Sequence, residues 1–258
     1  MIVYREPGLC GLELWRGVSR GVSLFQLRER KQEYFLGLRD FLIRLHHGEA
    51  ATLDQRETAA LRKAAGFTRV ILCGGETNSP FVASTFCTSA LPFAVEIDRA
   101  GPYAARRGAL RIFESMNWRH GIALDLGQLQ LKVMTAKTSR TVSRDESHFP
   151  FGASALAPEL GRARLRELLQ TGLDRASQSP DGVVLALPVE LDCEGVARAA
   201  TYPGLFGPVE PIFSELFTCP WVVLNDAVLA ALSFPPRNGE KTLVVTLGFG
   251  IGGALWDR

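Results

Sequence analysis

Three segments of the chain run from apolar residues into glycines, as a strand does when it ends in a tight turn. They are Val70–Gly75 (VILCGG), Ile122–Lys132 (IALDLGQLQLK) and Leu243–Gly253 (LVVTLGFGIGG). Glycine reaches backbone conformations that other residues avoid, so backbone N–H groups in such a turn can approach a phosphate closely. A single turn of this kind is weak evidence, but three of them accompanied by acidic residues indicate phosphotransfer chemistry.

Asp226 is the leading candidate for a catalytic base. It follows the apolar run Trp221–Leu224 and precedes a helix-like segment, so its carboxylate could accept a proton from a substrate hydroxyl. Asp226 could instead be a helix N-cap, because Asn and Asp are favoured there. Asn225 either orients a substrate or caps the same turn.

Asp125 and Lys132 are the charged candidates beside the second glycine segment, which turns at Gly127. Asp125 would hold magnesium through water, since Mg²⁺ keeps several waters and prefers one or two carboxylates. The alternative is a structural aspartate at the end of a strand. Lys132 either reaches a phosphate or points to solvent.

The remaining candidates are glycines whose backbone would face a nucleotide. Gly248, Gly250, Gly252 and Gly253 would present amides to the phosphates, and Gly74 and Gly75 would let an adenosine lie against the backbone. The alternatives are a glycine-rich hairpin that binds nothing and an ordinary strand-to-helix turn.

Hydrophobic periodicity predicts the elements that position these residues. The expected helices cover 24–45, 52–65, 80–89, 102–116, 158–177, 211–217 and 227–232, and the expected strands cover 69–73, 93–97, 122–126, 129–135, 140–144, 182–187, 221–224 and 242–247. The segment Glu190–Val209 has no clear periodicity and is expected to be irregular.

Composition favours a soluble globular protein and argues against several other classes. The net charge of +2 gives no reason to expect nucleic acid or an anionic membrane as a partner. No run reaches the roughly 20 apolar residues of a membrane helix. The five cysteines are widely spaced without a CxxC pair, which indicates free thiols in a reducing, cytoplasmic setting.

These segments resemble the actin-like ATPase superfamily of sugar kinases, actin and Hsp70, and most of all the ROK sugar kinases. Asp125-Leu126-Gly127 with Lys132 resembles the first phosphate hairpin of that family. Leu224-Asn225-Asp226-Ala227 resembles its catalytic turn, Gly248–Gly253 its second phosphate hairpin, and Val70–Gly75 its adenosine turn.

The resemblance implies an α/β fold of two actin-like (ribonuclease H-like) lobes around an interlobe cleft. The adenosine turn comes first in this chain, which implies a circular permutation. One lobe would be 119–236, and the other would combine 1–118 with 237–258. This order predicts that Thr242–Leu247 and Arg69–Cys73 share one sheet and that Ile122–Leu126 lies in another.

The chain also departs from the family pattern. Gln128-Leu129 and Phe249 replace small or hydroxylated residues of the two phosphate turns, and Thr201-Tyr202-Pro203-Gly204 stands where the family has its sugar contacts. The family's zinc segment, with its cysteine cluster, has no counterpart, so the resemblance implies no structural zinc.

The expected function is ATP- and Mg²⁺-dependent phosphorylation of a hydroxyl on a sugar or similar small metabolite. Asp226 would be catalytic, and Asn225, Thr201 and Glu190 would contact the substrate. A catalytically weak nucleotide-binding or regulatory protein of the same fold is the alternative, and an α/β scaffold that binds no nucleotide is a third reading. The resemblance implies neither a nucleic-acid nor a membrane partner and allows a homodimer.

Overall fold

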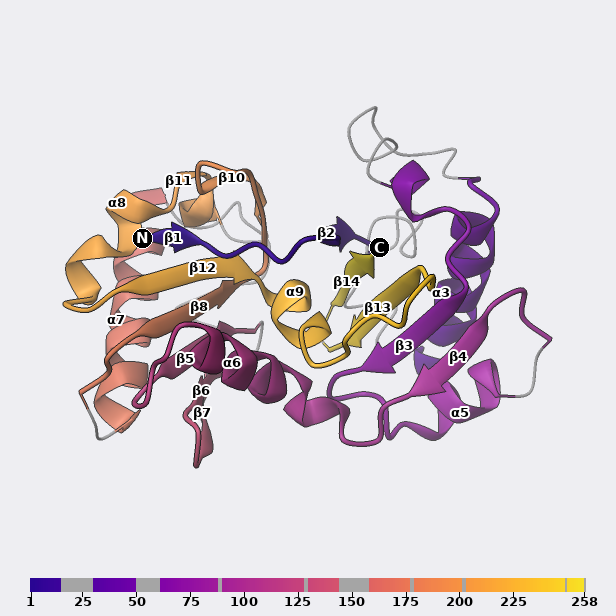
Figure 1. Ribbon diagram of the computed structural model, residues 1–258, viewed down its shortest axis with the longest axis horizontal. Helices are drawn as coiled ribbons and strands as arrows, with labels where there is room; N and C mark the ends of the chain where they lie inside the picture. The colour runs from indigo at the N-terminus through magenta and orange to yellow at the C-terminus, as the bar shows by residue number, and fades with distance from the viewer. Residues whose placement is uncertain are drawn as a thin grey trace. The chain divides into compact units, whose positions relative to one another are not determined.

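The computed structural model describes residues 1–14, 30–49, 61–87, 90–127, 130–143, 158–176, 179–200, 203–248 and 250–257. The chain divides into two compact units. The first unit comprises Met1–Arg5 and Ala105–Ser233, and the second comprises Glu6–Ala104 and Phe234–Arg258. Each unit combines helices with a mixed sheet, so the fold class is α/β, as the sequence predicted (Figure 1).

The first unit contains a six-stranded sheet in the order β1-β12-β8-β5-β6-β7. Strands β1, β12, β8 and β5 run parallel to one another. Strand β6 is antiparallel to β5, and β7 is antiparallel to β6. The bounds are β1 Ile2–Val3, β12 Trp221–Asn225, β8 Val183–Leu187, β5 Ile122–Leu126, β6 Gln130–Met134 and β7 Ser139–Ser143. Strands β5 and β8 are buried along their whole length, which explains why β8 is entirely apolar and why Asp125 is the one polar residue of β5.

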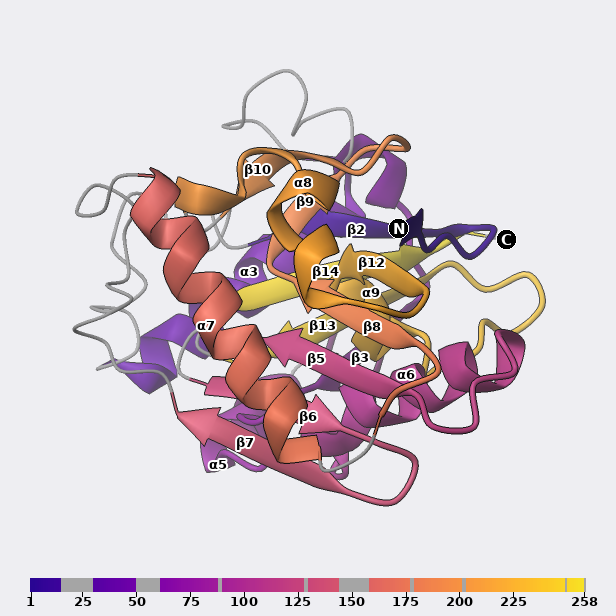
Figure 2. The same cartoon turned by 90° about the vertical axis from the view of Figure 1, so that its left-hand side faces the viewer.

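Helix α7 (Pro158–Ala176) covers one face of this sheet, as Figure 2 shows. Its Leu165 and Leu169 are fully buried in a cluster with the apolar side chains of β5, β6 and β8. Gly172 lets the helix come close to the sheet, because a Cβ atom there would lie 2.7 Å from Leu131 Cδ2. Asp125 and Lys132 belong to the opposite set of alternating residues and are not part of this cluster.

The expectation that Glu190–Val209 is irregular was wrong. This region forms a three-stranded antiparallel sheet of β9 (Val189–Leu191), β10 (Val196–Ala200) and β11 (Gly207–Pro208). The strands are short, and alanine-rich β10 has little intrinsic strand preference. Asp192 shapes the turn between β9 and β10 by accepting hydrogen bonds from the backbone N–H groups of Val196 and Glu194, which lowers its pKa.

The rest of the first unit consists of short helices and one longer helix. They are α6 (Ala104–Ser115), η2 (Pro203–Leu205), α8 (Glu210–Phe213), η3 (Ser214–Leu216) and α9 (Asp226–Ala231). The boundary between the two units falls at the first residue of α6. None of the helices in the described parts of the chain is long and apolar enough to cross a membrane.

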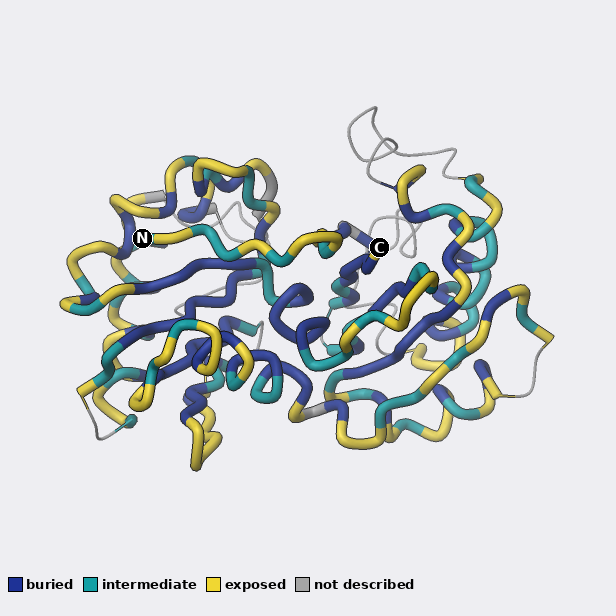
Figure 3. The backbone as a smooth tube through the Cα atoms, viewed as in Figure 1, coloured by how far each residue is buried: buried dark blue, intermediate teal, exposed yellow. Residues whose placement is uncertain are grey.

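The second unit contains a five-stranded sheet in the order β2-β14-β13-β3-β4. Strands β13, β3 and β4 are parallel, and β14 and β2 are antiparallel to their neighbours. The bounds are β2 Leu9–Glu13, β14 Ile251–Trp256, β13 Thr242–Leu247, β3 Arg69–Cys73 and β4 Ala94–Ile97. Strand β3, which lies between β13 and β4, is buried throughout, as Figure 3 shows.

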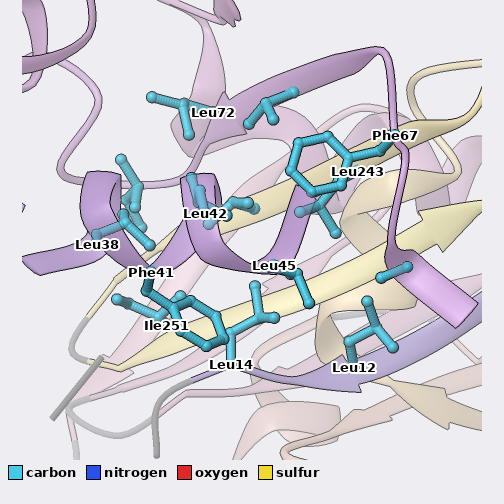
Figure 4. Close-up of a cluster of buried hydrophobic side chains, with 14 of the residues drawn as sticks. Leu12, Leu14, Leu38, Phe41, Leu42, Leu45, Phe67, Leu72, Leu243 and Ile251 are labelled. Carbon is cyan, nitrogen blue, oxygen red and sulfur yellow. The ribbon is translucent and has the colours of Figure 1, made fainter. Parts of the chain in front are cut away.

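Helix α3 (Lys31–His46) closes the core of the second unit. Its Leu38, Phe41, Leu42 and Leu45 point at the sheet in Figure 4, where they meet side chains that include Leu14, Leu243 and Ile251. Spacings of three and four residues place these side chains on one helix face, which is the pattern the sequence showed. Helix α5 (Pro80–Phe86) and the 3₁₀ turn η1 (Gly101–Tyr103) complete this unit.

The expected arrangement of the glycine-ended strands is confirmed. Thr242–Leu247 pairs in parallel with Arg69–Cys73, and Ile122–Leu126 lies in the other sheet.

Strand β2 was not predicted from the sequence. Its central Gly11 and terminal Glu13 give only a weak strand signal. Part of the expected helices at 24–45 and 52–65 lies outside the described residues.

The two sheets share one arrangement of strands. In each, a central strand (β5 or β13) pairs on one side with an antiparallel strand (β6 or β14) that is followed by a second antiparallel pairing (β7 or β2), and on the other side with parallel strands. In the first sheet β7 follows β6 directly in sequence, whereas β2 comes from the opposite end of the chain to β14. The end of β14 nevertheless adjoins the start of β2, because Asp257 N donates to Gly8 O at 2.7 Å.

Gly108 marks a close crossing of α6 and α9 within the first unit. A Cβ atom at Gly108 would lie 1.8 Å from the backbone oxygen of Leu229. Real Cβ atoms do not approach backbone atoms this closely, so the two helices could not cross in the same way with any other residue at this position.

We therefore predict that Gly108→Ala destabilises the protein by about 2 kcal/mol or more, because the helix backbones must move apart. Helix propensity alone predicts the opposite sign, a gain of about 1 kcal/mol. Chemical denaturation measures the difference, and Arg111→Ala on the exposed face of α6 is the control. A stabilised Gly108→Ala variant would contradict the close crossing.

Candidate functional site

The carboxyl ends of β5, β8 and β12 meet at one edge of the first sheet and carry its two acidic candidates. Asp125 pairs in register with Ala186 of β8, which pairs with Leu224 of β12. Asp226 follows shortly after Leu224. Asp125, on β5, and Asp226, just beyond the end of β12, therefore lie at the same edge on either side of β8, where the two strands are roughly 10 Å apart. Ligands of open α/β sheets bind at such carboxyl ends.

Asp125 is paired with Lys132 across the β5–β6 hairpin. The two residues are directly opposite in the antiparallel register, and Lys132 Nζ donates to Asp125 Oδ2 at 2.8 Å. The Asp125 side chain is 6% exposed and that of Lys132 is 33% exposed. Lys132 therefore contacts a carboxylate and does not simply point to solvent.

Asp125 is buried and is not part of the glycine turn itself. Asp125 lies within β5, whose residues are all buried, and the turn begins after Leu126. Gly127 N donates to Gln130 O at 3.1 Å and closes that turn. Replacing Asp125 therefore changes a buried ion pair as well as any ligand site. Gln128, Leu129 and Phe249 lie outside the described residues.

Asn225 is the N-cap of α9, so the cap alternative for Asp226 was wrong. Asn225 Oδ1 accepts from the backbone N–H groups of Ala227 at 2.9 Å and Val228 at 3.3 Å. Its Nδ2 group donates to Val189 O at 2.9 Å. With its oxygen and nitrogen both engaged, Asn225 fixes the turn. Asp226 is the first residue of α9 and is half-buried, and its Oδ1 accepts from Ala227 N at 2.8 Å.

Glu190 lies close to this turn in the chain, because it follows the Val189 carbonyl that Asn225 holds. It is an exposed residue of β9 and faces Ala199 of β10 in the strand pairing. The structure thus brings Glu190 toward the Asn225–Asp226 turn. The other expected substrate contact, Thr201, falls outside the described residues.

Gly74 begins a turn (residues 74–77) that the second unit holds tightly at the end of β3. Gly74 has φ of +102°, and a Cβ atom there would lie 2.5 Å from Leu247 O of β13. Thr77 is fully buried, and its hydroxyl donates to Gly74 O at 2.8 Å. Gly101 of η1 packs against the same turn, because a Cβ atom there would lie 2.7 Å from Gly74 N. Glycine at 74 is therefore required by the fold.

Gly75 and Gly248 differ from Gly74 because nothing in the described structure requires glycine at either position. A Cβ atom on Gly75 would meet nothing within 4 Å, and the residue is exposed. A Cβ atom on Gly248 would make one ordinary contact, 3.7 Å from Gly250 O. Neither has a positive φ angle. They follow β3 and β13, which are neighbouring parallel strands, so two glycines with open space on their Cβ side lie at one sheet edge, although the N–H group of Gly248 is engaged by Gly250 O.

Gly253 does not fit the expectation that it presents an amide to a phosphate. It is buried, and a Cβ atom there would lie 2.5 Å from Leu14 Cδ1. The glycine makes room for Leu14 in the core. Gly252 pairs with Thr246 of β13 and is half-buried, and Gly250 O accepts from Gly248 N at 3.1 Å.

The sequence did not single out Thr77 or Gly101, although they position the Gly74 turn. The glycine pair drew attention to the turn, but its support comes from two residues in other segments. Glu76 adds two further ties, because its N–H donates to Leu247 O at 3.0 Å and its carboxylate accepts from Lys31 Nζ at 3.0 Å. Only the fold shows that these groups meet.

A cavity of about 220 Å³ lies at the amino-terminal end of the first sheet, away from the acidic edge. Val183, Phe217 and Cys219 are among its lining residues. Burial raises the pKa of the Cys219 thiol, so this thiol is not an activated nucleophile. None of the candidate residues from the sequence lines this cavity.

Asp125 is the right type of donor for Mg²⁺, which takes oxygen ligands and keeps several waters. Within the described ranges, no group of three or more His, Cys, Asp or Glu residues could hold a metal ion. Any Mg²⁺ at Asp125 would therefore depend on water and ligand phosphates for its remaining ligands. It would also meet the ammonium group of Lys132.

The cap geometry predicts that Asn225→Ala destabilises the protein by about 1–2 kcal/mol, because the helix loses its cap and Val189 O loses a donor. Asn225→Asp keeps the acceptor and should lose less. Thermal or chemical denaturation of the two variants measures the difference. Equal stability of Asn225→Ala and the parent would show that the cap contributes nothing.

No protein-family model matches this chain, and a search of curated proteins found no match to it.

Proposed function

We propose that this protein binds ATP with Mg²⁺ and transfers its terminal phosphoryl group to a hydroxyl of a sugar or similar small metabolite. The observation that carries the proposal is the pair of open glycines, Gly75 and Gly248, at the carboxyl ends of adjacent parallel strands. The absence of a side chain at these two positions leaves space beside the backbone for a ligand, and the N–H group of Gly75 would face it, whereas that of Gly248 already donates to Gly250 O. Phosphates and nucleosides are the ligands that bind closely to such backbone.

The first unit supports the transfer step. Asp226 stands at the carboxyl edge of its sheet, where Asn225 is the N-cap of α9 and one carboxylate oxygen of Asp226 accepts from Ala227 N. In the proposed reaction, Asp226 accepts the proton of the attacking hydroxyl. Glu190 and Thr201 contribute to the acceptor site, and Asn225 holds the turn in place. Bound Mg²⁺ at Asp125 would neutralise charge on the phosphates.

We further propose that the two units are actin-like lobes in a circularly permuted order, related to the ROK sugar kinases. Two observations support this. The two sheets share the same order and direction of strands around β5 and β13. The end of β14 adjoins the start of β2, where an unpermuted chain would need only a short hairpin turn.

A catalytically weak nucleotide-binding or regulatory protein is the second candidate function. The Asp125–Lys132 ion pair favours it, because this carboxylate already has a cationic partner. The packing of Gly253 under Leu14 points the same way, since it removes one of the expected phosphate contacts. Turnover with a panel of hydroxyl acceptors separates the two functions.

Nucleotide binding is tested with Gly75→Leu. Because a Cβ atom at Gly75 would meet no protein atom within 4 Å and the residue is exposed, the variant should keep its stability within about 0.5 kcal/mol. Its side chain should fill the space that the ligand needs, and ATP affinity measured by calorimetry should fall at least about tenfold, or 1.4 kcal/mol.

Ala94→Leu is the control for this variant, because Ala94 is exposed at the amino-terminal end of β4 in the same sheet. It adds a leucine away from the glycine edge and should leave ATP affinity unchanged. If Gly75→Leu binds ATP as well as the parent does, the open glycine has no part in nucleotide binding.

Catalysis is tested with Asp226→Asn. The substitution removes a proton acceptor without touching the Asn225 cap, so the unfolding free energy should change by less than about 1 kcal/mol. Loss of a general base should lower kcat by about 10²–10⁴-fold while ATP still binds. Steady-state turnover and ATP titration measure both quantities.

Asp174→Asn is the matched control, an exposed carboxylate on α7 in the same unit. It should leave kcat unchanged. Near-normal turnover of Asp226→Asn would reject Asp226 as the base. A parent protein that binds ATP but phosphorylates no acceptor would favour the regulatory function instead.

A further inference from the structure

The ion pair between Asp125 and Lys132 is set by the strand register. The two residues face each other directly across β5 and β6, and Lys132 Nζ lies 2.8 Å from Asp125 Oδ2. Directly opposed side chains project from the same face of a sheet, so the pairing needs no loop movement. Lys132 therefore supplies the charge that a nearly buried carboxylate requires.

A divalent cation and the Lys132 ammonium group compete for the same carboxylate. An ammonium group and Mg²⁺ bound to one carboxylate would repel each other strongly in a site where only 6% of the aspartate side chain is exposed. Cation binding at Asp125 therefore requires the ammonium group to leave. The Asp125 site thus discriminates against divalent cations while Lys132 is in place.

Lys132 is able to leave because its side chain is one-third exposed and its ammonium group ends a flexible stem. A phosphate oxygen is an alternative charged acceptor for that ammonium group. Leu126 and Leu131 pair next to this ion pair, and the turn between them closes with the Gly127–Gln130 hydrogen bond. A phosphate at this turn would lie within the reach of a lysine side chain.

We propose that Lys132 is an exchangeable counter-ion. Without phosphate it neutralises Asp125 and keeps divalent cations out. A bound phosphate group draws the ammonium group away, and Asp125 then accepts the cation. Phosphate and cation binding are thus coupled, and each strengthens the other by the same factor. The exchange step rests on the proposed nucleotide function, whereas the exclusion of cations does not.

The test compares the parent with Lys132→Met in two separate titrations. The first uses Mn²⁺ alone and follows the loss of the free-ion electron paramagnetic resonance signal. The second uses ADP in excess chelator and follows heat by calorimetry. Lys132→Met should bind Mn²⁺ about tenfold more tightly and ADP about tenfold more weakly, because each change alters one charge-assisted contact.

Three further variants serve as controls. Lys132→Arg keeps the positive charge and should resemble the parent in the Mn²⁺ titration. Lys137→Met removes an exposed lysine of the β6–β7 turn and should change neither titration. The double variant Lys132→Met with Asp125→Asn leaves no uncompensated buried charge, so it should fold even if the single variant does not. It should bind ADP as weakly as Lys132→Met and should show no gain in Mn²⁺ affinity.

Opposite changes in the two titrations support the exchange, since general destabilisation would weaken both ligands. An unchanged Mn²⁺ affinity in Lys132→Met, or a gain that persists in the double variant, would overturn the exclusion of cations by Lys132. If Lys132→Met shows the expected gain in Mn²⁺ affinity but the parent protein binds no ADP, the exchange step is overturned together with the proposed nucleotide function. The two failures are therefore distinguishable.

Discussion

The parallel pairing of β5, β8 and β12 is the constraint on which the acidic edge depends. Its register aligns Asp125, Ala186 and Leu224, so the residues that follow these strands emerge at one edge. A shift of one residue in either pair would turn Asp125 into the face covered by α7 and move a leucine into its place. The buried apolar side chains against α7 oppose such a shift. The core of the unit therefore maintains the position of its charged residues.

In the second unit, close backbone contacts fix the turn at Gly74, at the sheet edge where Gly75 also lies. Gly74 reaches Leu247 of the neighbouring strand, and Gly101 and Thr77 pack around the same turn. These contacts leave no space for side chains, whereas Gly75 immediately beyond them meets nothing. A rigid turn with one open backbone segment is suited to bind a ligand without rearrangement. Such preorganisation reduces the ordering cost of binding.

Sequence reasoning succeeded where one physical signal dominated. Strands β3, β5 and β13 have the predicted bounds, because uninterrupted apolar runs ending in glycine predict strands buried on both faces. It failed for β2, β9 and β10, which are short and carry polar or small residues. Strand pairing with distant segments stabilises them, and no local pattern shows which segments those are.

The candidate site was predictable as a set of residues but not as a set of roles. Asn225 and Asp226 were equally plausible caps, and only the bonds of Asn225 to Ala227, Val228 and Val189 decide between them. Gly75 and Gly253 look alike in sequence, yet one is open and the other lies under Leu14. The role of a glycine depends on what its missing side chain would touch, which is a property of the folded chain.

The shared strand arrangement also makes positions in the two hairpins equivalent, and the differences at these positions are informative. Thr246 pairs with Gly252 and Cys73 in the second sheet as Asp125 pairs with Lys132 and Ala186 in the first. The first hairpin therefore carries an ion pair where the second carries a hydroxyl and a glycine. An ion pair responds to an approaching charge, while a neutral glycine hairpin responds mainly to shape.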